Sequence, residues 1–118
     1  SILFSLLTYR KFIFHILSTP LHYAAKKNQA LATRLLLDDG ADPCIFDKNG
    51  FTPLHSACEY GSNDVINTLF ENKMDPNTSF RKGVYFIFLT LAPIHIAVQC
   101  QHIDTVELLY NNGADVNI

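Results

Sequence analysis

The chain has 118 residues, 48% of them hydrophobic, which suits one domain with a buried core and excludes a largely disordered segment. A formal net charge of -2 and a pI near 6.1 exclude the strongly basic balance that supports nucleic-acid binding. The three cysteines are widely spaced and contain no C-x-x-C pair, so they indicate neither a disulfide framework nor a zinc cage. We expect Cys44, Cys58 and Cys100 to be reduced, small and partly buried residues of a cytoplasmic or nuclear protein.

The first segment, 1–18, is an apolar leader. Arg10, Lys11 and His15 interrupt it before the ~20 uncharged residues that a membrane span needs. It also lacks the basic start and the cleavage site of a secretory signal. We therefore expect no membrane association, and interpret 1–18 as an irregular leader or a partial capping helix.

From residue 19 onward the sequence repeats itself. Thr19-Pro20-Leu21-His22 aligns with Thr52-Pro53-Leu54-His55 at a shift of 33 residues. A third copy begins at Pro93-Ile94-His95, but its shift from the second copy is 40 residues, so a segment has been inserted. The chain thus divides into three repeats at 19–46, 47–79 and 80–118, with the insertion near 84–91. Since the chain begins at Ser1 and stops within a repeat, we expect it to be part of a longer protein.

Each copy predicts two short helices. A threonine before a proline favours a helix start, because the hydroxyl caps free N–H groups and the proline is preorganised for the first turn. Helices this short are marginal alone, so each repeat must pack on its neighbours. The motif residues that define the copies are Thr19, Pro20, His22, Thr52, Pro53, His55, Pro93 and His95.

A second helix is predicted from apolar spacing in the third copy, and from a following glycine in the first and third copies. In the third copy an apolar stripe is expected, and the opposite face is expected to be polar. The stripe comprises Ile103, Val106, Leu109 and Tyr110, and the polar face Asp104, Thr105 and Glu107. Gly40 and Gly113 are expected to end such helices in a left-handed conformation.

A period of 33 residues with a T-P-L-H-x-A core resembles the ankyrin-repeat family. The second copy carries most of the family pattern, including Asp47, Gly50, Ala57, Gly61 and Asp75, and the third ends in Gly113-Ala114-Asp115-Val116-Asn117. The resemblance implies an all-α solenoid of stacked helix-turn-helix repeats with hairpin-like turns between repeats. It also implies that the recurring histidines hydrogen-bond within their own turn and to the adjacent repeat.

Catalysis and cofactor binding have little support. The recurring histidines lie one repeat apart, ~10 Å for packed helices, which is too far to share a metal with bonds of ~2 Å. No phosphate-binding, nucleophile-elbow or zinc-protease motif is present. We therefore expect no enzyme activity, cofactor, metal or small-molecule substrate in this segment.

The resemblance implies a protein-binding surface formed by the inter-repeat turns and the first helices. The residues expected to be exposed there are Lys26, Lys27, Lys48, Asn49, Phe51, Glu59, Tyr60, Arg81, Lys82, Gln99 and Cys100. Phe51 and Tyr60 lead this set because aromatic residues dominate interface hot spots. The basic members favour an acidic segment of another protein as partner, although each lysine is also a common solvated surface residue. The alternatives are a structural spacer, or a regulatory segment of a larger protein whose activity lies elsewhere.

The insertion at 84–91 allows three interpretations. It is rich in Phe, Ile, Leu and Tyr, as is the leader 1–18. In the first interpretation, both segments are translated non-coding sequence. In the second, the insertion is an apolar loop that contacts a partner. In the third, the insertion is padding that folds back over the stack.

Overall fold

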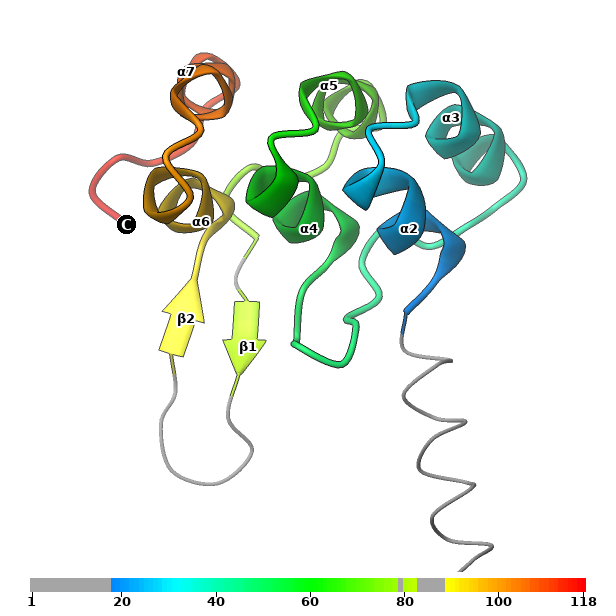
Figure 1. The fold of residues 1–118 in the computed structure, drawn as a ribbon, viewed down its shortest axis with the longest axis horizontal. Helices are drawn as coiled ribbons and strands as arrows, with labels where there is room; N and C mark the ends of the chain where they lie inside the picture. Colours follow the sequence, from blue (N-terminus) through cyan, green and yellow to red (C-terminus); the bar gives the residue numbers. More distant parts are fainter. Residues whose placement is uncertain (1–17, 79, 83–88) are drawn as a thin grey trace, which may run out of the picture.

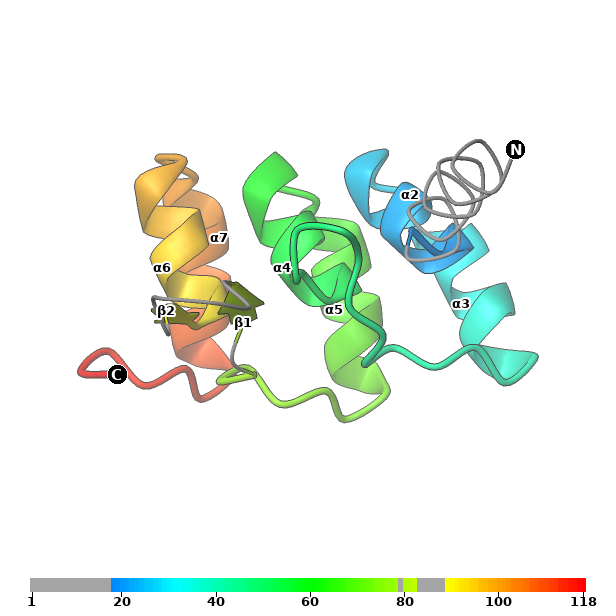
Figure 2. The same ribbon diagram turned by 90° about the horizontal axis from the view of Figure 1, so that it is seen from below.

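The computed structural model describes residues 18–78, 80–82 and 89–118. Six helices and one two-stranded sheet lie in these ranges: α2 (Pro20–Lys26), α3 (Ala30–Asp38), α4 (Pro53–Tyr60), α5 (Asn63–Glu71), β1 (Phe80–Lys82), β2 (Leu89–Leu91), α6 (Pro93–Gln99) and α7 (Ile103–Asn111). The helices form three antiparallel pairs, with α2, α4 and α6 in one row and α3, α5 and α7 in a second (Figures 1 and 2). The predicted all-α solenoid is confirmed. The predictions for residues 1–17 and 84–88 lie outside the described residues.

Each first helix begins at a proline. Thr19, Thr52 and Ala92 precede Pro20, Pro53 and Pro93 in extended conformation. The Thr52 hydroxyl accepts a hydrogen bond from the His55 backbone N–H at 3.5 Å. Ala92 has no such acceptor, and α6 starts without it, because the backbone of Ala92 still accepts the His95 N–H at 3.0 Å.

At the two ends of the stack, helices α3 and α7 are each followed by a glycine in the predicted left-handed conformation. Gly40 has a φ of 93° and Gly113 a φ of 96°, a region that side chains with a Cβ rarely enter. The residue after each glycine donates its N–H back to the helix, Ala41 to Leu36 and Ala114 to Leu109. These bonds satisfy carbonyl groups that the helix end leaves unpaired.

The core lies between the two rows of helices. Small residues line it where first helices approach one another: Ala24, Ala25, Ala57 and Ala97 are all buried. Larger apolar side chains fill the rest, among them Leu54, Val65, Ile66, Leu69, Ile94, Ile96 and Leu109. Burial of this area against neighbouring repeats compensates for helices of seven to nine residues that are too short to persist alone.

The stripe expected on α7 is partly wrong. Leu109 is buried, but Ile103 is 75% exposed and Tyr110 61% exposed. Thr105, assigned to the polar face, is buried instead. Its hydroxyl donates to the side-chain oxygen of Asn63 at 2.6 Å, so the hydroxyl is paired within the junction between repeats.

Two hairpin-like turns project from the α2, α4 and α6 side of the stack (Figure 1). The first, 47–51, closes with the Asp47 N–H donating to the Phe51 carbonyl oxygen at 2.8 Å. The second is the antiparallel pair β1 and β2, in which Phe80 pairs with Leu91 and Lys82 with Leu89. The part of the insertion that the structure describes, 89–91, is therefore strand β2.

Candidate functional site

Each motif histidine joins its own repeat to the next turn. The Nδ1 atom of His22 accepts the backbone N–H of Thr19 at 3.2 Å and the Thr19 hydroxyl at 2.8 Å. The ring proton must therefore lie on Nε2, which donates to the carbonyl oxygen of Phe51 at 2.7 Å. The ring of His22 thus connects the start of α2 to the turn before α4.

The same arrangement recurs one repeat further along. His55 accepts the Thr52 N–H at 3.2 Å and donates from Nε2 to the carbonyl oxygen of Leu91, in β2, at 3.1 Å. His95 accepts the Ala92 N–H at 2.9 Å and donates to the carbonyl oxygen of Ile118 at 3.1 Å. These bonds point successively along the stack and not towards one centre.

Burial keeps two of these rings neutral. Desolvation lowers the pKa of His55 to about 4, although its backbone hydrogen bond to Leu91 acts in the opposite direction. Desolvation also lowers the pKa of His22, against the effect of its bond to Phe51. A protonated ring could not accept at Nδ1, so both hydrogen-bond patterns require the neutral form.

Asp47 shapes the first turn. It is buried, and its Oδ1 accepts the backbone N–H groups of Asn49 at 2.8 Å and Phe51 at 2.9 Å. Aspartate suits such turns because its carboxylate reaches nearby N–H groups of its own segment. This fixes the Phe51 carbonyl that His22 binds. The sequence placed Asp47 in the repeat pattern but did not predict this role.

A second set of contacts between repeats was not predicted. Asn28 follows α2, and its side-chain oxygen accepts the N–H groups of Asp64 at 3.1 Å and Val65 at 3.3 Å, which caps the start of α5 from the preceding repeat. His102 donates from Nε2 to the Glu59 carbonyl oxygen at 2.8 Å. Further bonds of this kind join Asn77 to Gly113 and Asp115, and Arg34 to Glu71. Asn28, Arg34 and His102 stand at positions that carry a different residue in each copy, so periodicity alone gave no signal for them.

Six of the predicted contact residues share equivalent positions at the C-terminal ends of the first helices. We call Lys26, Lys27, Glu59, Tyr60, Gln99 and Cys100 the contact strip, since Lys26, Glu59 and Gln99 correspond to one another in the repeat, as do Lys27, Tyr60 and Cys100. Lys27 and Gln99 are exposed, and Tyr60, at the centre of the contact strip, is 53% exposed. Lys26, Glu59 and Cys100 are half-buried, against the expectation of exposure. The Lys26 ammonium lies 5.7 Å from the centre of the Tyr23 ring.

The turns carry the other predicted residues. Lys48 and Asn49 are exposed in the first turn, whereas Arg81 and Lys82 belong to β1, where only their backbone pairing is described. The expectation of an exposed Phe51 is wrong. Its ring is half-buried against the core and stacks on His55, with ring centres 5.7 Å apart, because the turn folds it over the start of α4.

Exposed apolar residues beside the first turn were missed. Ile45 and Phe46 are both exposed and immediately precede Asp47. The second repeat has Thr78 and Ser79 at these positions. A comparison of the copies for apolar residues at polar positions would have found them.

The cysteines and histidines offer little reactive chemistry. All three cysteines are described and are free; Cys44 is exposed, which contradicts the expected partial burial. Cys58 is buried, and desolvation raises the pKa of its thiol. Within residues 18–78, 80–82 and 89–118, no cluster of His, Cys, Asp or Glu could hold a metal ion. In the same part of the chain, no helix has the length and hydropathy to cross a membrane.

Comparisons with known proteins agree on one family. A family model described as ankyrin repeats (3 copies) matches residues 3–79, and one described as ankyrin repeats (many copies) matches 54–109. The chain is 36% identical to human NF-kappa-B inhibitor alpha over 112 residues, which cover 94% of the chain and 35% of that protein. It is 33% identical to human B-cell lymphoma 3 protein over 99 residues, 84% of the chain and 21% of the relative. A putative ankyrin repeat protein of fowlpox virus is 32% identical over 96 residues, 80% of the chain and 27% of the relative.

Proposed function

Because the chain belongs to the ankyrin-repeat family, we propose that this segment binds another protein along the contact strip and the neighbouring turn tips. The observation that carries the proposal is a row of equivalent positions at the ends of the three first helices, in which Lys27 and Tyr60 are exposed and adjacent and Cys100 is half-buried. A rigid row of this kind suits an extended partner segment, since little side-chain or backbone order is lost on binding.

The chemistry of the strip favours an acidic segment. Lys26, Lys27 and Lys48 bring positive charge to this side of the stack, and Tyr60 supplies an aromatic anchor between polar neighbours. Opposite charge on a partner would steer association and fix its register more than it would raise affinity. The half-buried Phe51 acts here by supporting the turn.

The relatives support a binding role for this segment. NF-kappa-B inhibitor alpha is named for its action on another protein, and the chain spans 35% of it. Three free cysteines support a reducing compartment, the cytoplasm or the nucleus.

Selection from a library of random peptides displayed on phage tests the proposal. The immobilised chain should enrich peptides rich in Asp and Glu, and Lys27→Glu with Tyr60→Ala should abolish their binding. Tyr110→Ala is the matched control, because Tyr110 is also an exposed tyrosine, 61% against 53% for Tyr60, but lies on α7. Failure to enrich any sequence would favour a structural spacer, and peptides that ignore the double substitution would place binding elsewhere.

A further inference from the structure

The junction between the first and second repeats is stabilised by the side-chain amide of Asn28. Asn28 lies in the loop between α2 and α3 with a φ of 52°, and caps α5 through the N–H groups of Asp64 and Val65. Its amide nitrogen also donates to the Asp64 carboxylate at 3.2 Å. The residue before α5 at this junction is Ser62, which is small and buried and makes no side-chain cap of its own. A small residue there lets the Asn28 amide reach the helix start.

The second junction uses the opposite combination. Gly61 occupies the position of Asn28, with a φ of 65°, and His102 occupies the position of Ser62. The His102 ring fills the space beside the glycine: a Cβ added to Gly61 would lie 3.0 Å from His102 Nδ1 and 3.2 Å from its Cε1. The ring then donates to the Glu59 carbonyl oxygen. A side chain at position 61 would therefore press on the His102 ring, which would have to move by a few tenths of an ångström.

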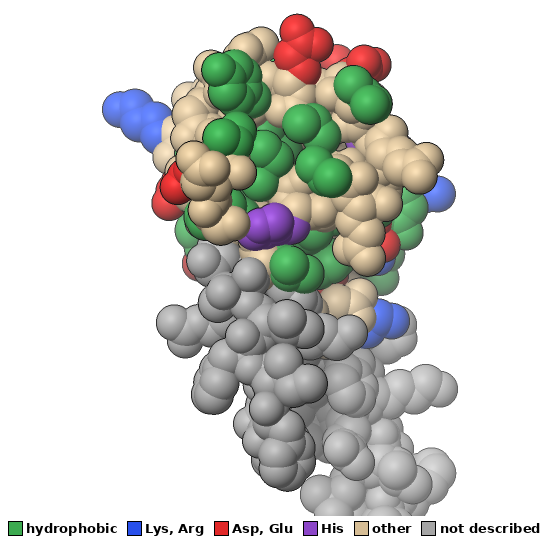
Figure 3. Space-filling model, turned by 90° about the vertical axis from the view of Figure 1, so that its left-hand side faces the viewer, with side chains coloured by type: hydrophobic (Ala, Val, Ile, Leu, Met, Phe, Trp, Pro, Cys, Tyr) green, Lys and Arg blue, Asp and Glu red, His purple; other side chains and the backbone are tan. Residues whose placement is uncertain are grey.

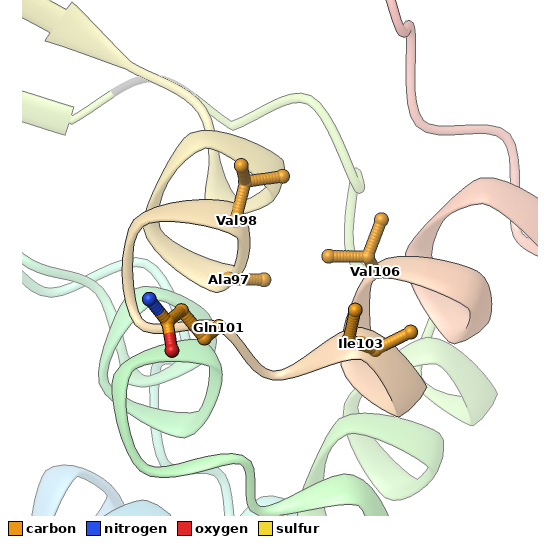
Figure 4. A pocket seen from close by; sticks show the side chains of 5 residues that line it. All are labelled: Ala97, Val98, Gln101, Ile103 and Val106. Carbon is orange, nitrogen blue, oxygen red and sulfur yellow. The ribbon is translucent and has the colours of Figure 1, made fainter.

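In the third repeat, no following repeat covers the equivalent position within the described residues. Gln101 corresponds to Asn28 and Gly61, and has a φ of 61°. It lines a groove of about 420 Å³ between α6 and α7, together with Ala97, Val98, Ile103 and Val106 (Figure 4). Hydrophobic side chains gather over the middle of this end of the stack, with acidic side chains towards its rim (Figure 3). Val98 is 59% exposed, although its counterparts Ala25 and Cys58 are fully buried by the following repeat.

We propose that this groove binds a further helix-turn-helix repeat stacked in the same register, and that Gln101 selects one whose second helix is preceded by a small residue such as serine. The surface continues the interface that already joins the first and second repeats and the second and third. Gln101 carries an amide, as Asn28 does, so its partner must leave room for the amide as Ser62 does. A repeat with histidine at that place would crowd Gln101, as an Asn28-like side chain at position 61 would crowd His102.

The test extends the full chain after Ile118 with a copy of residues 46–78, which continues the repeat register. Four proteins combine Gln101 or Gln101→Gly with an appended copy that keeps Ser62 or carries Ser62→His. Hydrogen exchange of the appended amides and urea unfolding report how firmly the copy docks. With Gln101, the serine version should be protected on the order of fivefold more strongly than the histidine version, about the effect of one hydrogen bond. With Gln101→Gly the order should reverse.

Two further variants make the result unambiguous. Val98→Lys should remove the protection of the appended copy and leave the chain without an extension unchanged, because Val98 is exposed there. Leu31→Glu, at an exposed position of α3, should have no effect on docking. An appended copy that is unprotected in all four proteins would show that the groove does not take a repeat. The same order with Gln101 and with Gln101→Gly would overturn the selection by Gln101.

Discussion

The Nε2 atom of His55 lies 3.1 Å from the carbonyl oxygen of Leu91, and this bond ties the second repeat to the strand that leads into the third. The two residues are 36 positions apart in the sequence. The same ring accepts the Thr52 N–H, so one neutral imidazole satisfies two backbone groups of different repeats. The stack is therefore held by directional bonds as well as by apolar burial.

Replacing His55 should destabilise the chain far more than replacing His95. His55→Ala leaves the Leu91 carbonyl and the Thr52 N–H without this ring and opens a cavity in the core, which should cost about 3 kcal/mol. His95 is only half-buried and binds Ile118, so His95→Ala should cost about 1 kcal/mol. Urea unfolding followed by circular dichroism measures both. Equal losses would show that His55 adds nothing beyond a common turn contact.

The chain should lose stability in mild acid. The pKa of His55 is about 4 in the folded chain and 6.5 when unfolded, so below pH 6.5 the unfolded state takes up a proton that the folded state does not. The stability is present above pH 6.5 and is lost as pH falls towards 4. The negative charge of Asp47 partly opposes the lowering of the His55 pKa. The pKa of His22 is lowered in the same direction as that of His55.

Between pH 7.5 and pH 5, the lowered pKa of His55 should remove about 2 kcal/mol of unfolding free energy. Urea unfolding at the two pH values measures the loss, and His55→Gln should reduce it strongly because glutamine does not titrate. A loss that is unchanged in His55→Gln would assign the acid sensitivity to other groups.

Asn28 should contribute through its amide and not through its backbone conformation alone. Asn28→Gly keeps a residue suited to a φ of 52° but removes the cap on α5, and should cost about 1 kcal/mol. Lys73→Gly is the matched control, since Lys73 has a φ of 62° and caps no helix in the described residues. That substitution should be neutral or stabilising by relieving the strain. If both glycine variants behave alike, the cap has no net effect.

Gly61 and His102 should be coupled. Gly61→Ala places a methyl group against the His102 ring and disturbs its bond to Glu59, so we expect a loss of about 2 kcal/mol. In the presence of His102→Ala, the same substitution should cost only the backbone strain, about 1 kcal/mol. A double-mutant cycle of thermal or urea unfolding measures the difference. Additive losses would contradict the close contact.

The repeat period was sufficient to predict the stack. The recurrence of proline and histidine, with threonine before the proline in the first two copies, placed the first helices correctly, because local capping preferences are set by adjacent residues. The apolar spacing of α7 also located the helix. It could not distinguish a face covered by another repeat from one left open, so Ile103 was expected inside and is exposed.

The bonds of the motif histidines to the adjacent repeat were expected from the family resemblance, but the other contacts between repeats were not. Asn28, Gly61 and Gln101 are three different residues at one repeat position, and their roles depend on which residue the next repeat places beside them. The resemblance implied an exposed Phe51 in the inter-repeat turn, but Asp47 folds that turn so that the ring lies on His55. Tertiary contacts of this kind override local pattern.

The most direct test of the binding surface is a backbone amide NMR titration of the chain with a short acidic peptide from the selection. The largest shifts should fall on Lys27, Tyr60 and Gln99, should follow the strip across all three repeats, and should weaken as salt is added. Shifts confined to α3, α5 and α7, or shifts unaffected by Lys27→Glu with Tyr60→Ala, would contradict binding along the strip.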